Sequence, residues 1–180
     1  ASAAGVVAAR RPGSWANGLR VGIIDAKADQ ILGINTTNAA VGSGVTQAVP
    51  ANTVIAGAGT TFLLDGYFKG IVTEVGEGEI SAKILTHVSS AGKFTNIGYQ
   101  QGGVYKFSKD SQIGFHTTGG SVGVATTIAT TKDWFDQQEL TLTSSSTVKW
   151  NQLADRPGTS EYATSRGSRF DEVHIVVIDG

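Results

Sequence analysis

The chain has no cysteine, no methionine, only three prolines and few charged residues. Without cysteine it can form no disulfide, no thiolate zinc site and no cysteine nucleophile, which is compatible with folding in a reducing cytoplasm. Charged residues make up 16% of its 180 residues, against about a quarter in ordinary globular domains. The net charge of −1 provides no field that would attract nucleic acid or anionic lipid. We therefore expect no nucleic-acid partner.

Long apolar runs are also missing. No stretch approaches the ~20 residues that a helix needs to span a bilayer, and no basic segment followed by an apolar one marks a signal peptide. The sequence therefore predicts no membrane partner. The missing methionine, together with an apolar strand that runs to the end of the chain, leads us to expect a segment of a larger protein.

Glycine is abundant, with 24 residues, and apolar residues make up 40% of the chain. This mixture, with long runs of alanine, threonine and serine, is typical of many short strands and loops. We predict one α+β, mainly β domain over residues 1–180, an antiparallel sheet or sandwich with a few short helices and long Gly/Thr/Ala-rich loops. The uncharged residues 35–59 are predicted to form a variable surface loop or a region of weak strands.

Alternating apolar residues and turn-forming pairs predict the individual elements. Leu19, Val21 and Ile23 share one face of a strand over residues 19–25. Turns are predicted at residues 65–66, 77–78 and 89–93. Further strands are predicted at residues 62–64, 67–75, 79–88, 95–99, 104–107, 112–116 and 140–143, and helical turns at 26–34 and 161–165. The final run, residues 173–178, is nearly all apolar and predicts a strand buried on both faces.

Three arginines, Arg156, Arg166 and Arg169, lie on the polar loop before this final run. They could clamp an anion, or pair with carboxylates of the same loop or of a neighbouring molecule. A guanidinium binds a carboxylate through two parallel hydrogen bonds, and arginine is enriched at interfaces. We favour the second interpretation and predict that these arginines belong to an interface.

Residues able to do chemistry form no recognised catalytic pattern. The sequence has no zinc-protease helix motif, no nucleophile elbow and no phosphate-binding loop, so we predict neither enzyme activity nor a cofactor. Asp171, Glu172 and His174 are close in sequence, either as the start of a metal site or as the polar beginning of a strand. The second interpretation is favoured, and no metal ligand is predicted.

Three aromatic residues, Trp134, Phe135 and Trp150, also allow two interpretations. They could form a platform on which a sugar stacks, or they could pack in the core. Core packing is favoured because tryptophan is mostly buried in folded proteins.

Residues 11–21 carry the pattern Pro-Gly-x-Trp-x-Asn, and four later segments follow it in the chain. In their residues and their order these segments resemble tail sheath proteins of T4-like contractile-tailed bacteriophages. Residues 11–21 resemble the Pro-Gly-x-Trp-Gly-Asn start of a middle segment of that family, with Ala16 in place of the usual glycine. Residues 133–138, 150–151, 156–160 and 171–179 resemble its later part, although Ser168, Arg169 and Phe170 replace a glycine-rich approach. Residues 35–131 match only in the texture of the sequence, that is, in their general amino-acid composition.

The resemblance implies a structural role. Sheath subunits form a helical polymer around the tail tube, and contraction of the sheath drives the tube through the host envelope without nucleotide hydrolysis. This segment would be an outer spacer and contact domain, located in the virion after assembly in the host cytoplasm. Its partners would be other sheath subunits and, through an inner domain outside this chain, the tail tube. The isolated segment is expected to be a monomer. The alternative is a carbohydrate-binding or adhesin-like β module, suggested by the Gly/Thr/Ser texture and the aromatic residues.

Overall fold

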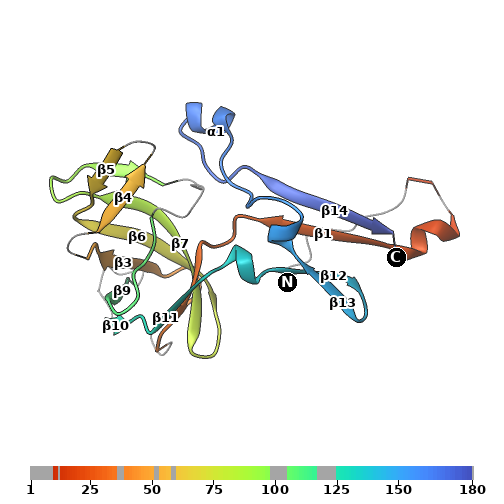
Figure 1. Cartoon of the computed structure of the whole chain (residues 1–180), viewed down its shortest axis with the longest axis horizontal. Helices are drawn as coiled ribbons and strands as arrows, with labels where there is room; N and C mark the ends of the chain where they lie inside the picture. Colours follow the sequence, from red (N-terminus) through yellow and green to blue (C-terminus); the bar gives the residue numbers. More distant parts are fainter. Residues whose placement is uncertain are drawn as a thin grey trace. The chain divides into compact units, whose positions relative to one another are not determined.

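The computed structural model describes residues 10–11, 13–35, 39–50, 53–57, 60–97, 105–116 and 125–179 (Figure 1). These residues are mainly β, in curled antiparallel sheets. The described chain divides into two compact units. Unit 1 contains residues 1–26 and 138–180, and unit 2 contains residues 27–137. Unit 2 is therefore an insertion between two parts of unit 1.

Unit 2 is built on one antiparallel sheet. Its strands follow the order β10-β9-β3-β6-β7-β2-β11, and β8 pairs with β7 off this path. A separate hairpin joins β4 (Val54–Gly57) to β5 (Thr60–Leu63). The sheet strands are β2 (Gln30–Gly33), β3 (Gly44–Ala48), β6 (Tyr67–Val75), β7 (Glu79–Val88), β8 (Phe94–Asn96), β9 (Gln112–His116), β10 (Thr126–Thr127) and β11 (Thr130–Asp133).

The two ends of this sheet are close together in the chain. β10 and β11 stand at opposite ends of the strand order, yet only Ile128 and Ala129 separate them. Ile128 N donates to Ser111 O at 3.1 Å, while Ala129 N donates to Gly33 O of β2 at 2.8 Å. The sheet must therefore curl on itself into a barrel-like form. Its interior holds the apolar core: Leu32, Ile34, Val45, Phe68, Val72, Ile80, Ala82, Ile84, Ile97, Phe107, Ile113, Phe115 and Ile128.

Two glutamines are buried beside this core, Gln30 on β2 and Gln47 on β3. Gln30 Nε2 donates to Phe107 O at 3.1 Å, and Phe107 N donates to Gln30 Oε1 at 2.7 Å. Gln47 makes the same pair of bonds with Ser108, at 3.0 and 2.6 Å. Residues 105–108 belong to no strand, so the glutamine amides provide the hydrogen bonds that a neighbouring strand would otherwise supply.

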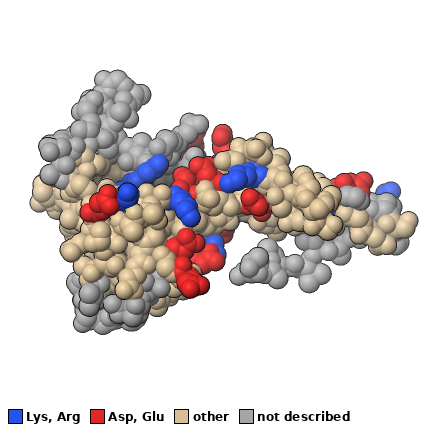
Figure 2. All heavy atoms as spheres, turned by 60° about the horizontal axis from the view of Figure 1, so that its bottom comes forward, with Lys and Arg blue, Asp and Glu red and all other residues tan. Residues whose placement is uncertain are grey.

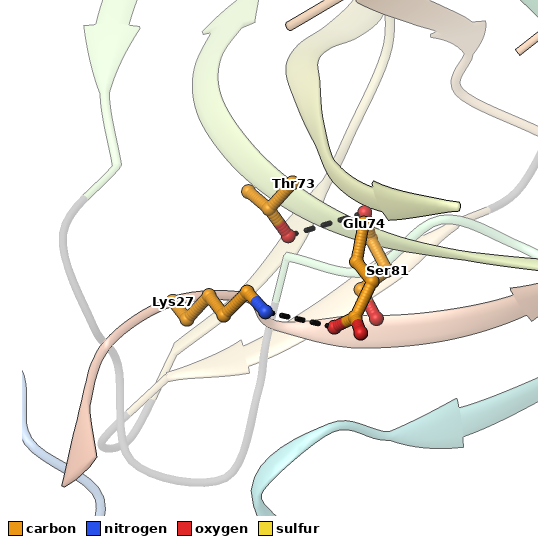
Figure 3. A network of polar contacts seen from close by, with 4 residues as sticks. All are labelled: Lys27, Thr73, Glu74 and Ser81. Atoms are coloured by element: carbon orange, nitrogen blue, oxygen red, sulfur yellow. Dashed lines mark hydrogen bonds and ion pairs between the residues drawn. The ribbon is translucent and has the colours of Figure 1, made fainter. Parts of the chain in front are cut away.

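The long β6–β7 hairpin is bent by a bulge. Its register shifts between Val72 and Glu74, and Thr73 Oγ1 donates to Ser81 O at 3.2 Å (Figure 3). The adjacent Glu74 carboxylate accepts a hydrogen bond from Lys27 Nζ at 2.8 Å. A bulge increases local twist and curvature, which a curled sheet needs. The ion pair is about half exposed and contributes little to stability.

Unit 1 contains two antiparallel ribbons. β1 (Leu19–Asp25) pairs with β14 (Val173–Asp179), and β12 (Glu139–Thr143) pairs with β13 (Ser146–Lys149). Its helical turns are η1 (Ser14–Gly18), η3 (Trp150–Gln152) and α1 (Glu161–Ser165). A fourth turn, η2 (Phe135–Gln137), ends unit 2. No helix of the described residues is long and apolar enough to cross a membrane.

The predicted turns at Asp65-Gly66, Glu77-Gly78 and residues 89–93 are confirmed. Gly66, Gly78 and Gly92 each adopt positive φ there, at 80°, 73° and 78°. The strands at 19–25, 67–75, 79–88, 112–116 and 140–143 and the helical turn at 161–165 are confirmed too.

Two predictions of secondary structure are wrong, those for residues 26–34 and 105–107. Residues 26–34 form no helical turn, because β2 is held as a strand between β7 and β11. For residues 35–59, predicted as a surface loop or weak strands, the structure agrees with strands, since β3 pairs with both β6 and β9 and β4 pairs with β5; residues 36–38, 51–52 and 58–59 lie outside the described residues. Residues 105–107 form no strand, and the Gln30 side chain binds the backbone of Phe107 there; residue 104 is not described.

Candidate functional site

The arginine-bearing loop of unit 1 is closed at its base by carboxylates. Ser160 N donates to Asp171 Oδ1 at 2.9 Å, and Ser160 Oγ donates to Asp171 Oδ2 at 2.7 Å. Gly158 N donates to Glu172 Oε2 at 2.7 Å. Phe170 N donates to Thr159 Oγ1 at 3.0 Å. Residues 158–160 and 170–172 are thus fastened side by side, and residues between them form a closed excursion that carries α1.

Ser160 also starts α1. Its hydroxyl oxygen accepts from Ala163 N at 3.1 Å, as an N-cap serine does. The backbone N–H of Ser160, followed by its hydroxyl, lowers the pKa of Asp171 below the ordinary value of 3.8. The same hydroxyl therefore binds the helix start and the ionised carboxylate, so the two ends of the loop depend on one side chain.

The three predicted arginines all lie on this part of the chain. Arg166 is exposed at the end of α1, and its guanidinium carbon lies 3.7 Å from the centre of the Tyr162 ring. Arg169 lies 5.6 Å from the centre of the Phe170 ring, and Arg156 is half-buried beside Pro157. Asp171, a carboxylate of the same loop, accepts hydrogen bonds from Ser160. Arg166 and Tyr162, which is 67% exposed, are both available to another molecule.

The metal interpretation of Asp171, Glu172 and His174 gains no support. Both carboxylates accept hydrogen bonds from the backbone, at Ser160 and Gly158. Within the described part of the chain, no group of three or more His, Asp or Glu side chains could hold a metal ion. His174 Nδ1 is buried and finds no hydrogen-bond partner among the described residues. The carboxylates of Asp171 and Glu172 close the loop, and they form the polar segment just before strand β14.

The predicted aromatic residues are buried. Trp134, Phe135 and Trp150 are each at most 4% exposed. The prediction of core packing is confirmed, and these rings present no face to a sugar. In unit 1, Trp150 packs with Leu140 against Gly22 of β1: a Cβ at Gly22 would overlap Leu140 and lie 3.3 Å from Trp150 Cζ2.

Unit 2 brings together a serine, a histidine and an aspartate that the sequence did not single out. Ser90 Oγ donates to Asp65 Oδ2, and His87 Nε2 donates to the backbone oxygen of Asp65 at 2.6 Å. A catalytic triad needs the histidine between the serine and the carboxylate, whereas here the serine meets the carboxylate directly. These bonds fasten the turn at residues 89–93, and the Ser90 hydroxyl and N–H lower the pKa of Asp65.

The β1–β14 ribbon has one covered face and one open face. Val21 stands opposite Val177, and Ile23 opposite Ile175. These four side chains and Val173 are exposed, with Ile175 and Val177 at 61%. The prediction that residues 173–178 are buried on both faces is therefore wrong for the described residues, because β14 pairs with β1 alone and one face has no layer over it. In the sequence, the alternation of apolar residues along 19–25 indicates which side chains share this face.

Figure 2 draws one face of the molecule, on which lysine and arginine are interspersed with aspartate and glutamate among the described residues. The exposed apolar face of the ribbon and the exposed Tyr162–Arg166 pair point to contacts with other molecules.

Comparisons with models of known families, with curated proteins and with solved structures find no match to this chain.

Proposed function

We propose that the chain is a segment of a contractile tail sheath subunit, in which unit 1 makes contacts and unit 2 is an outward spacer. The supporting observation is how the resemblance divides between the units. Residues 11–21, 150–151, 156–160 and 171–179 belong to unit 1, and residues 133–138 span the boundary. The stretch that matches in texture alone, residues 35–131, falls wholly within unit 2.

The architecture of unit 2 suits an insertion. Its first strand, β2, and its last strand, β11, are paired, with Gln30 opposite Asp133. Trp134 N also donates to Asp29 O at 3.0 Å, just outside this pairing. The chain thus enters and leaves unit 2 at neighbouring points, which lets an inserted domain change its sequence without changing its host.

The architecture of unit 1 suits a contact role. Its ribbon carries an apolar face open to solvent, and its arginine loop carries the exposed Tyr162–Arg166 pair. Contiguous exposed apolar surface is typical of interaction sites. In the sheath these surfaces would meet other subunits or the inner domain that contacts the tail tube. Contraction would exchange one packing of such interfaces for another, with no covalent chemistry in this segment.

The carbohydrate-binding alternative has lost its main support. It depended on Trp134, Phe135 and Trp150, which are buried. The texture of the sequence remains, but texture selects no ligand.

The proposal is tested on contractile phage particles whose genome encodes this chain. Antibody fragments raised against unit 2 should decorate the tail at regular intervals along its whole length in electron micrographs, before and after contraction. Fragments raised against an unrelated protein are the control. Labelling confined to fibre tips would favour the adhesin alternative, and unlabelled sheaths in particles whose sheath is accessible to other antibodies would reject the proposal.

A further inference from the structure

We propose that the open face of the β1–β14 ribbon binds an amphipathic helix that carries lysine or arginine near both of its ends. The ribbon face is defined by Val21, Ile23, Val173, Ile175 and Val177, with Asp25 and Asp179 at its ends. This inference rests on the geometry of unit 1 alone and holds whether or not the chain belongs to a tail sheath.

The ribbon face is apolar in the middle. Residues at alternate positions of a strand share a face, and the register places Val21 opposite Val177 and Ile23 opposite Ile175. The opposite face is already covered, because Ile24 is buried and Gly22 lies against Leu140 and Trp150. A sheet needs a packed layer on each apolar face, and the described residues form no such layer over the ribbon face.

The two ends of the ribbon face are acidic. Asp25 stands opposite Val173 at one end, and Asp179 stands opposite Leu19 at the other. Both carboxylates are exposed, and neither has an ion pair among the described residues. Six residue steps along β1 separate these ends, which corresponds to roughly 20 Å at the rise of a strand. An occupant therefore needs an apolar middle and a cation at each end.

A second copy of the chain does not meet this requirement. Asp25 and Asp179 lie at opposite ends of the ribbon face, so two copies laid face to face in either direction would bring one carboxylate of each copy to the same end of the interface, with no cation beside them on the ribbon face. Like charges brought together across an interface disfavour the complex. A strand added to a ribbon edge would pair its backbone and leave the face open.

A helix meets the requirement. It is about 10 Å wide, which suits two strands about 4.8 Å apart, and roughly 13 residues span 20 Å. Apolar side chains three and four residues apart give one stripe for the ribbon face. Lysine or arginine at the two ends would reach Asp25 and Asp179 while their aliphatic stems extend the apolar contact.

The test uses the whole chain and two fluorescent helical peptides of about 14 residues, the length of the ribbon face. Both have leucines three and four residues apart; one has lysines near both ends and the other has glutamates there. Fluorescence anisotropy should show saturable binding of the lysine peptide and binding at least about tenfold weaker for the glutamate peptide.

Three variants make the test specific. Ile175→Thr combined with Val177→Thr should weaken binding of the lysine peptide about tenfold or more, since it removes central apolar contacts. Val41→Thr, at a valine of unit 2 that is 67% exposed, should leave binding unchanged. Asp25→Lys combined with Asp179→Lys should reverse the preference between the peptides. Both side chains are exposed and form no ion pair among the described residues.

Equal affinity for the two peptides, no binding of either, or binding that persists in the threonine pair would each overturn the proposal. Sedimentation of the chain alone gives a further check. Concentration-dependent dimers that disappear in the threonine pair would identify a second copy as the occupant and would also overturn it.

Discussion

The side-chain amide of Gln30 exchanges two hydrogen bonds with the backbone of Phe107, 77 residues further along the chain. An amide side chain has the same donor and acceptor as a peptide group, so Gln30 acts here as a short piece of strand. The bond pair anchors a segment whose Phe107 ring is 2% exposed in the core of unit 2. Gln47 does the same for Ser108, and the two glutamines together fix the irregular segment against the sheet.

Gln30→Leu should destabilise unit 2 by about 2–4 kcal/mol, because it leaves a buried N–H and a buried C=O of Phe107 without partners. Urea unfolding followed by tryptophan fluorescence measures the loss. Gln112→Leu is the control, since Gln112 is exposed at the start of β9 and its replacement should change stability by less than about 0.5 kcal/mol. Equal effects of the two substitutions would show that the amide bonds contribute nothing.

Gly66→Ala should cost more than Gly78→Ala, although both glycines have positive φ, at 80° and 73°. A Cβ at Gly78 meets nothing within 4 Å, so only the backbone conformation is penalised, by about 1 kcal/mol. A Cβ at Gly66 would overlap the Val88 carbonyl and lie 2.8 Å from Ser89 Cα. Thermal unfolding of the two variants separates the contributions, and equal melting temperatures would contradict the predicted backbone collision.

Strand alternation predicts part of the fold correctly and shows where sequence reasoning ends. It placed Leu19, Val21 and Ile23 on one face, and the register of β1 with β14 agrees. Whether a layer covers that face depends on elements distant in sequence, so burial of residues 173–178 could not be decided locally. Residues 26–34 failed for the same reason: β2 becomes a strand through pairing with β7 and β11.

Sequence reasoning also fails for polar residues that lie in the core. A glutamine at alternating positions of a strand looks solvent-facing, yet Gln30 and Gln47 point to backbone groups that only the folded chain brings near. For the candidate site, α1 and its serine cap were within reach of local rules, since serine is a favoured N-cap. The carboxylates of Asp171 and Glu172 that close the loop were not, because their partners precede α1.

The closure of the arginine loop should loosen in acid. The pKa of Asp171 is lowered in the folded state by the N–H and hydroxyl of Ser160, so the folded state binds the proton less readily than the unfolded chain. The stabilisation is fully present above the ordinary pKa of 3.8 and is lost as pH falls from there through the folded pKa. Hydrogen exchange at the Ser160 amide should therefore accelerate, relative to the chemical exchange rate, in that range.

Ser160→Ala is the matched variant for this test. It keeps the backbone N–H but removes the hydroxyl bond to Asp171 and the cap of α1. The pKa of Asp171, followed by carboxyl NMR shifts, should rise toward 3.8 without reaching it. A pKa that does not change would show that the hydroxyl has no part in lowering it.

Arg166→Ala should affect assembly more than folding. The guanidinium stacks on Tyr162 at an exposed position, where such a contact contributes about 0.5–1 kcal/mol, so unfolding of the isolated chain should change by no more than that. If the proposed sheath function holds and the arginine loop contacts neighbouring subunits, the same substitution in the full-length protein should lower the yield of assembled sheaths counted by electron microscopy. Arg166→Lys should restore the yield only in part, because an ammonium keeps the charge but neither stacks as a plane nor binds a carboxylate through two bonds.

Lys106→Ala, which removes an exposed cation from unit 2, is the control for charge alone. Arg156→Ala and Arg169→Ala extend the test to the other two arginines. If sheaths assemble equally well with each of the three substitutions, the arginine loop makes no essential contact between subunits, and the ribbon face becomes the candidate contact surface.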